Sequence, residues 1–269
     1  MPARRKIASE RVLVLVGRIV LFAGLLVAWQ LLSDHNIVKP FFASRPTDIA
    51  SRIWDLGRTG GLWKNLKPTL AEAAVGFAIS AVVGIAIGIL LARVRYLELV
   101  TRPLLDVLNT LPRIALAPLF VLWFGLGFEA KIFLIVSVVI FAFIINTYSG
   151  VKSVNPDYVR MAQSLGATRI RILQKIVLPS ITPWLFAAIR FGIAYSFATA
   201  VVAEIVSANH GLGYLISYSA GTLDTTGEFA ALVILAIVAM AIQAVLVSAE
   251  NHVLRWRRFE RGSTGTSAS

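Results

Sequence analysis

Long apolar stretches alternate with short polar ones along most of the chain. Six of these stretches are long enough for a helix that crosses a bilayer, which needs roughly 20 mostly apolar residues. They lie near residues 13–33, 68–92, 103–126, 131–151, 181–206 and 229–252. Apolar runs of this length favour helices over strands. The sequence therefore predicts an all-α, polytopic membrane protein with six transmembrane helices.

The third stretch is interrupted by Pro103, Pro112 and Pro118. Because proline lacks a backbone donor and its ring crowds the preceding helical turn, we expect this span to be bent or broken. The first stretch follows three basic residues, as a signal sequence does, but it is longer and no small-residue cleavage site follows it. We interpret it as an uncleaved first span.

Composition supports a membrane chain and excludes several kinds of chemistry. Hydrophobic residues make up 57%, charged residues 15%, and the mean hydropathy is +0.77, whereas soluble domains carry about a quarter charged residues. There is no cysteine, and hence no disulfide framework or thiolate metal site. The phosphate-loop, H-E-x-x-H and G-x-S-x-G motifs are also absent. We therefore expect no catalytic residue, metal site or cofactor in this chain.

The net charge of +12 would suggest nucleic acid in a soluble protein. In a membrane protein it more often reflects basic loops that stay in the cytoplasm. Sixteen of the 26 basic residues fall in the N-terminal tail, the loops after the second and fourth spans, and the C-terminal tail. Seven fall on the other side, and one of these, Lys131, is counted in the outer loop after the third span. The positive-inside rule then places both termini in the cytoplasm.

The spans divide the chain into five parts. These are a cytoplasmic basic tail at 1–12, the first helix at 13–33, an outer loop at 34–67, a five-helix core at 68–254, and a cytoplasmic tail at 255–269 whose end we expect to be disordered. In the outer loop, Ile49, Ile53, Trp54 and Leu56 lie near one helical face. An interfacial helix and a folded extramembrane loop are both open interpretations.

Small residues recur every four positions in the second span, at Gly76, Ser80, Gly84 and Gly88. Such a row lets another backbone approach closely. We favour helix packing within the chain, with a subunit interface as the alternative.

Polar groups inside the spans are candidates for a solute pathway. Ionisable side chains are costly in lipid, so they tend to face protein or a water-filled path. The candidates are Arg113, Arg190, Glu204, Asn109 and Asn146. The alternative for each is structural pairing between helices.

The cytoplasmic loop at 152–180 predicts two short helices. Residues 155–157 supply an asparagine cap, a first-turn proline and an aspartate that complements the helix dipole. Gly166 is suited to end this helix in a left-handed conformation. A second, basic helix is expected at 169–176, after which Pro179 redirects the chain into the fifth span. A soluble partner could dock on this helix–turn–helix.

This loop resembles the "EAA" coupling loop of bacterial ABC importer permeases, E-A-A-x-x-x-G-x9-I-x-L-P. The matching positions, at the full spacing, are Ala162, Gly166, Ile176, Leu178 and Pro179. Arg160 stands where the family's glutamate is expected and Met161 where the first alanine is, while Ala167 follows the motif glycine. Segments 111–118 (LPRIALAP), 122–127 (LWFGLG), 146–151 (NTYSGV) and 211–214 (GLGY) are similar to the nitrate/sulfonate/taurine branch.

The resemblance implies a non-catalytic subunit with the type I ABC importer permease fold, in the bacterial plasma (inner) membrane. Two copies would form a homodimeric pore. Cytoplasmic ABC ATPase subunits, which bind ATP and magnesium, would contact the coupling loops, and an extracytoplasmic solute-binding protein would deliver the solute. Members of the branch take up small anions, such as sulfonates, taurine or nitrate, or small heteroaromatic compounds. No nucleic-acid partner is implied.

Two other classes of function remain open from the residues. An ion-coupled secondary transporter would need an ionisable coupling site, for which Glu204 is the candidate, and would transport without an ATPase. A membrane scaffold or sensor would show no solute dependence.

Overall fold

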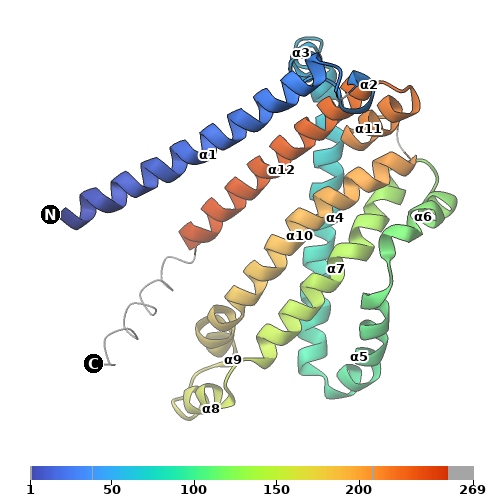
Figure 1. The fold of residues 1–269 in the computed structure, drawn as a ribbon. Coiled ribbons are helices and arrows are strands. Elements are labelled where there is room, and N and C mark those ends of the chain that lie inside the picture. Colours follow the sequence, from blue (N-terminus) through green and yellow to red (C-terminus); the bar gives the residue numbers. More distant parts are fainter. Residues whose placement is uncertain (1, 38, 208, 254–269) are drawn as a thin grey trace. The chain divides into compact units, whose positions relative to one another are not determined.

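The computed structural model describes residues 2–37, 39–207 and 209–253, and every regular element within them is helical (Figure 1). In chain order the helices are α1 (Pro2–Asp34), α2 (Pro40–Ala43), α3 (Pro46–Arg58), α4 (Gly61–Arg93), α5 (Arg95–Thr110), the 3-10 turn η1 (Arg113–Leu116), α6 (Ala117–Phe124), α7 (Phe128–Lys152), α8 (Pro156–Ser164), α9 (Arg169–Ile172), the π-helical turn η2 (Leu173–Val177), α10 (Leu178–Ser207), α11 (Leu212–Gly221) and α12 (Thr225–Val253). The predicted all-α fold is confirmed.

In the described part of the chain, five helices are long and apolar enough to cross a membrane: α1 from Val16, α4, α7, the continuous helix Arg169–Ser207, and α12. The pair formed by α5 and the segment Arg113–Phe124 makes a sixth span if its two halves count as one, and it bends by 81°. The break falls at Pro112. Leu111, just before it, is extended with φ −66 and ψ 136, the conformation that a following proline favours. The expected bend in the third span is confirmed.

The chain forms two compact units, one made of Met1–Trp63 and Leu215–Ile234 and the other of Lys64–Tyr214 and Leu235–Ser269. In the first unit, hydroxyl groups tie the segment after α1 to the start of α12. The hydroxyls of Ser44 and Thr226 lie 2.8 Å apart, and Thr225 Oγ1 donates to the Phe41 carbonyl at 2.6 Å. The Thr225 bond satisfies a backbone carbonyl of the four-residue helix α2, which is too short to pair its own carbonyls within the helix.

The second unit is built around α7, whose side chains Leu134, Ile135, Val139 and Phe143 are almost fully buried. Helix α10 runs along α7 (Figure 1). The small residues of α4 also face α7: a Cβ added at Gly76, Gly84 or Gly88 would lie 2.4–2.7 Å from the side chains of Ile135, Phe143 or Thr147. The glycine row therefore lets the two helices approach closely.

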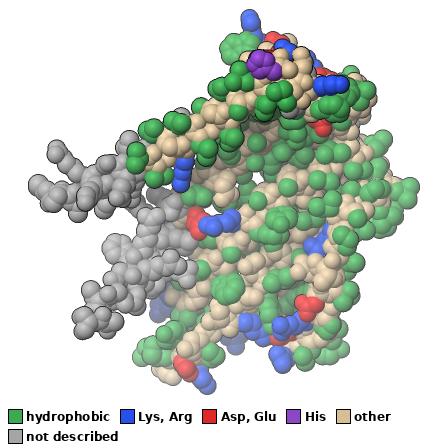
Figure 2. Space-filling model, in the orientation of Figure 1, with side chains coloured by type: hydrophobic (Ala, Val, Ile, Leu, Met, Phe, Trp, Pro, Cys, Tyr) green, Lys and Arg blue, Asp and Glu red, His purple; other side chains and the backbone are tan. Residues whose placement is uncertain are grey.

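Hydrophobic side chains cover the middle of the long helices, whereas basic side chains gather at the end that carries α8 and the start of α5 (Figure 2). An apolar girdle with polar ends is the pattern that a bilayer requires. The basic side chains thus lie at the ends of the long helices and not along their middle.

In the outer loop, residues 46–58 form helix α3, with Pro46 in its first turn and Arg58 in its last. Ile49 is buried and Trp54 is exposed, so this helix has one inward face. The short helix α11 was not expected from the sequence. The tail at 255–269 lies outside the described residues.

We expect Gly84→Ala to lower the stability of the second unit by about 1–3 kcal/mol, because overpacking has this cost. The new Cβ would meet the Ile140 carbonyl at 2.9 Å as well as Phe143, and a backbone atom cannot rotate away. Thermal unfolding in detergent measures the effect. The matched control is Gly24→Ala on α1, where a Cβ meets nothing within 4 Å. Equal melting temperatures for the two variants would contradict this account of the packing.

Candidate functional site

The loop between α7 and α10 contains two short helices joined by a tight turn. Asn155 caps α8 by accepting from the Asp157 N–H at 2.8 Å. At the other end, Ala167 N–H donates to the Ala162 carbonyl and Gly166 N–H to the Gln163 carbonyl, each at 2.9 Å. With Gly166 at φ +75, this is a Schellman motif. The motif explains why a glycine follows α8, because the position after the C-cap needs a positive φ.

Gly166 is needed for its backbone conformation and not for space within the chain. A Cβ placed there would meet nothing within 4 Å. Any side chain at this position would therefore point away from the rest of the chain, toward whatever docks on the loop.

The second half of the loop differs from the expectation. The predicted helix at 169–176 is α9 followed by the π-helical turn η2, and this turn leads directly into α10. Pro179 does not redirect the chain, because it is the second residue of α10. Leu178 N–H bonds to the Leu173 carbonyl five residues back, and this wider turn precedes the proline, whose ring would crowd the carbonyl four residues earlier. The second half of the loop and α10 are consequently one continuous helix, Arg169–Ser207.

The loop exposes an apolar face. Tyr158, Met161 and Leu165, at spacings of three and four along α8, are 59%, 61% and 80% exposed, and Ile170 of α9 is exposed as well. Arg160, which replaces the motif's glutamate, pairs with Asp157 at 2.6 Å on the surface of α8. A cluster of exposed apolar side chains on a polar connection between spans indicates a protein-binding surface.

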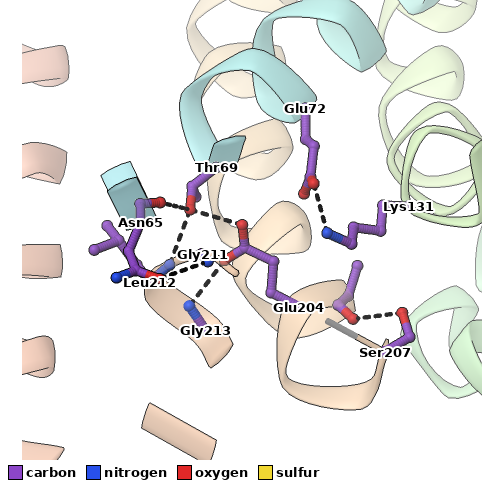
Figure 3. A network of polar contacts seen from close by, with 10 residues as sticks. Asn65, Thr69, Glu72, Lys131, Glu204, Ser207, Gly211, Leu212 and Gly213 are labelled. Carbon is purple, nitrogen blue, oxygen red and sulfur yellow. Dashed lines mark hydrogen bonds and ion pairs between the residues drawn. The ribbon is translucent and has the colours of Figure 1, made fainter. Parts of the chain in front are cut away.

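A buried polar network joins α4, α10 and the link between α10 and α11 (Figure 3). Glu204 Oε1 accepts from Thr69 Oγ1 at 2.7 Å, and its Oε2 accepts from the Gly213 N–H at 2.8 Å. Leu212 N–H donates to Thr69 Oγ1 and Gly211 N–H to Asn65 Oδ1, both at 3.0 Å. The side chains therefore satisfy three consecutive backbone donors, that of Gly211 just before α11 and those of Leu212 and Gly213 in its first turn, which have no partner within the helix.

Two glycines make this arrangement possible. Gly211 adopts φ +123, and a Cβ there would lie 2.1 Å from the Glu204 carboxyl group. A Cβ on Gly213 would lie 2.1 Å from the Val201 carbonyl. The link thus runs in direct backbone contact with Glu204 and α10.

An ion pair stands beside this network. Lys131 Nζ donates to Glu72 Oε1 at 2.5 Å, and both side chains are buried. Lys131, which the charge count placed in an outer loop, is in fact in the first turn of α7. Glu72, Lys131, Thr69 and Asn65 were not among the residues predicted for the site. The available signal was the polar stripe Asn65, Thr69 and Glu72, spaced by four and three on an otherwise apolar helix.

Arg113 is bound at the break of the third span. Its guanidinium donates to the Leu108 carbonyl at 2.7 Å, to the Val138 carbonyl at 3.3 Å and to Asn109 Oδ1 at 3.1 Å. It also lies over the Phe141 ring, 3.8 Å from its centroid. The bonds to Leu108 supply donors to a carbonyl in the last turn of α5, which the break leaves free, and the bond to Val138 ties the break to α7.

The remaining candidates lie elsewhere. Arg190 forms an ion pair with Glu250 of α12, with side chains 52% and 25% exposed. The pair borders a groove of about 510 Å³ that Phe186, Phe191 and Gln243 also line. Asn146 donates to the Ala142 carbonyl of its own helix at 2.8 Å. The five predicted pathway residues therefore do not converge on one site: Arg113 and Asn109 are together, and the other three are separate.

Helices that span a membrane, a broken third span and a loop that presents an apolar face define a membrane transport subunit. The chain belongs to the family of binding-protein-dependent transport system inner membrane components, whose model matches residues 84–258. It is therefore an ABC permease subunit, which is non-catalytic.

Relatives are similar over nearly the whole chain. The formylaminopyrimidine transport permease protein ThiX of Halalkalibacterium halodurans is 33% identical over 88% of this chain and 94% of its own length. The riboflavin transport system permease protein RibX of Chloroflexus aurantiacus is 32% identical over 86% and 87%. The taurine transport system permease protein TauC of Escherichia coli is 27% identical over 92% and 91%.

Solved structures support the fold. The inward-facing MetNI methionine ABC transporter has a chain with a TM-score of 0.60 and 22% identity, covering 74% of this chain and 96% of that one. A chain of an amino acid ABC transporter gives a TM-score of 0.61 at 15% identity, covering 73% and 96%. At these identities the likeness shows the fold alone. It agrees with the permease fold expected from the sequence.

Thr69→Val should destabilise the chain by about 1–3 kcal/mol, because the Leu212 N–H would be left buried without an acceptor. Amide hydrogen exchange of residues 211–213 should accelerate in the same variant. Thermal unfolding and exchange mass spectrometry in detergent measure both effects. Thr182→Val is the matched control, since the Thr182 hydroxyl bonds only to its own helix. If the two variants exchange equally slowly at the link, the network does not hold it.

Proposed function

We propose that this chain forms the solute pathway of an ATP-driven importer and that a separate cytoplasmic ATPase subunit docks on the loop formed by α8 and α9. The observation that carries the proposal is the exposed apolar face of α8, built from Tyr158, Met161 and Leu165. These side chains lie outside the spans, so lipid does not cover them. A partner protein would remove them from water.

The covalent connection of the loop supports its role in coupling. On one side α9 and η2 run without a break into α10, and on the other a short turn joins α8 to α7. A force applied to the loop would thus reach the two helices that pack most extensively in the second unit. Closure of the ATPase on ATP would favour one orientation of these helices over another, which is the population shift that alternating access requires.

The assembly we propose has two copies of this chain, two ATPase subunits that hold ATP and magnesium, and an extracytoplasmic solute-binding protein. Family membership supports these partners, because the family is named for binding-protein-dependent transport. The distribution of basic residues supports cytoplasmic termini and a cytoplasmic loop.

For the solute, we propose a small anion, such as a sulfonate, taurine or nitrate, or a small heteroaromatic compound. The names of the relatives span both kinds: taurine and nitrate on one side, formylaminopyrimidine and riboflavin on the other. Among the two arginines considered for the pathway, Arg190 is the better placed. It is half-exposed beside a groove, whereas the guanidinium of Arg113 is used by backbone carbonyls.

The class of transporter is tested by reconstitution in proteoliposomes with a candidate ATPase and a candidate solute-binding protein, sought first among the genes next to the one that encodes this chain. Uptake should require all three components and ATP. Uptake by the chain alone, driven by an ion gradient, would contradict the proposal and favour a secondary transporter. A binding assay on the solute-binding protein, with sulfonates, nitrate and heteroaromatic compounds as ligands, then identifies the solute.

Gly166→Arg should insert and fold normally but separate ATP hydrolysis from uptake. The arginine side chain would extend from the loop into the space where the ATPase docks, since nothing in this chain lies within 4 Å of a Cβ at Gly166. Gly166→Asn is the control for backbone strain, because asparagine tolerates a positive φ. Both variants are compared by detergent-extracted yield, ATP hydrolysis and uptake. Normal uptake by well-folded Gly166→Arg protein would refute docking at this turn.

Arg190→Gln and Arg113→Gln should have different consequences. Loss of Arg190 should raise the half-saturation concentration for uptake of an anionic solute, with little change in melting temperature. Loss of Arg113 should instead lower the melting temperature, because the carbonyls of Leu108 and Val138 would lose charged donors, each worth about 1.5–3 kcal/mol. Unchanged uptake kinetics in both variants would reject a role for either arginine in anion passage.

A further inference from the structure

We propose that Glu98 is the joint through which movement of the α8–α9 loop reaches the broken third span. The proposal rests on the proposed function and adds a second route from the loop into the membrane. Three features carry it: how Glu98 is bound, where its partners lie relative to the loop, and a void beside them.

Glu98 lies in the first turn of α5 and is 5% exposed. Its two carboxylate oxygens are bound by side chains of the neighbouring helix α7, and Oε1 also accepts from the exposed Arg95 of its own helix at 3.3 Å. Tyr148 Oη donates to Oε1 at 2.5 Å, and Lys152 Nζ donates to Oε2 at 2.8 Å. A buried carboxylate is strongly disfavoured without such partners, so α5 at this point must follow α7.

The partners of Glu98 lie immediately before the loop. Lys152 is the last residue of α7, and α8 begins at Pro156. The residues between them are held by hydrogen bonds: Ser153 N–H donates to the Ser149 carbonyl at 2.9 Å, and Asn155 caps α8. Because this connection is short and hydrogen-bonded, a displacement of α8 acts on Lys152 and, through Lys152, on Glu98.

The other end of α5 is tied to α7 as well. Arg113, just after α5, donates to the Leu108 carbonyl of α5 and to the Val138 carbonyl of α7. Helix α5 is therefore held by charged side chains at two points, Glu98 near its start and Arg113 beyond its end. A helix held in this way transmits a displacement along its length.

Beside this contact lies a partly open pocket of about 130 Å³, lined by Glu98 and Tyr148 themselves and by Leu91, Leu105 and Ile144 among others. Protein interiors are normally close-packed and resist displacement. The pocket leaves space next to α5 into which this helix can shift relative to α4 and α7. The hydrogen-bonded contact at Glu98 thus borders a part of α5 that packs loosely against α4 and α7.

The test compares Glu98→Gln, Lys152→Met and the double variant in the reconstituted transporter with its ATPase and binding protein. The measured quantity is solute transported per ATP hydrolysed. Each single change should lower this ratio roughly five-fold or more, the range of a typical coupling between sites, while ATP hydrolysis continues. The double variant should be no worse than either single one, since both remove the same contact.

Glu129→Gln is the matched control. Glu129 lies in the first turn of α7, is exposed, and makes no hydrogen bond or ion pair within the described residues. The same chemical change there should leave the ratio unaltered. If hydrolysis and uptake in Glu98→Gln instead fall together, in proportion to the amount of folded complex, Glu98 only stabilises the fold and the proposal is wrong.

A distance measurement tests the role of Glu98 separately from the proposed function as an importer subunit. The chain contains no cysteine, so spin labels can be placed by substitution to cysteine at Tyr96 of α5 and at Gln163 of α8, two exposed residues outside the apolar face of the loop. ATP should shift the distance distribution in the otherwise wild-type protein and not in Glu98→Gln. The same shift in both would overturn the role of Glu98 alone. Absence of ATP-driven uptake by the wild type would overturn the proposed function.

Discussion

A buried carboxylate must have partners, and the second unit satisfies this requirement at both of its ends. Glu72 and Glu204 lie at one end and Glu98 at the other. Lys131 and Lys152, the lysines of α7 that pair with Glu72 and Glu98, are separated by 21 positions, or roughly 30 Å of helix. Each contact joins two helices, because a charge removed from water has few other ways to be stabilised. Between the ends, helices α4 and α7 approach through glycine. Hydrogen bonds and ion pairs at the ends, together with close apolar packing in the middle, fix the register of α4, α5, α7 and α10.

The two polar ends differ in what they hold. At one end, the Glu204 network binds the backbone amides of Gly211, Leu212 and Gly213, so that end fixes the start of α11. At the other, Glu98 binds side chains of α7 that lie next to the docking loop. Side-chain contacts can be broken and remade with little change in the backbone, whereas three backbone donors held at once resist movement. The end near the loop is therefore the better suited to transmit a change of state, and the Glu204 end to keep its geometry.

Much of this organisation could be predicted from the sequence. The spans, the broken helix at Pro112 and the cap at Asn155 all depend on residues close together in the chain, where spacing and local chemistry decide the structure. The partners of buried charges could not be predicted in the same way. Lys131 and Glu72 are 59 positions apart and Glu204 and Thr69 are 135 apart, so their pairing depends on how the helices pack. Lys131 was consequently assigned to the outer loop after the third span, although it lies in the first turn of α7. Pro179 was misjudged for a local reason, because the π-helical turn before it makes room for a proline within a continuous helix.

The continuous helix gives the docking loop unequal connections to the core. Toward α10 there is no break between Arg169 and Ser207, so α9, in the second half of the loop, and Glu204, which anchors the far network, belong to one continuous helix. Toward α7 the connection passes through a capped turn and then through side chains to α5. Under the proposed function, one push on the loop would therefore act in two ways: as a rigid-body movement of α10 along its whole length, and as a displacement of α5 transmitted through Glu98. The bent pair α5–α6 can respond to the displacement of α5 because its two helices are already separated at Pro112. An unbroken helix in its place would have to move as one piece with α7.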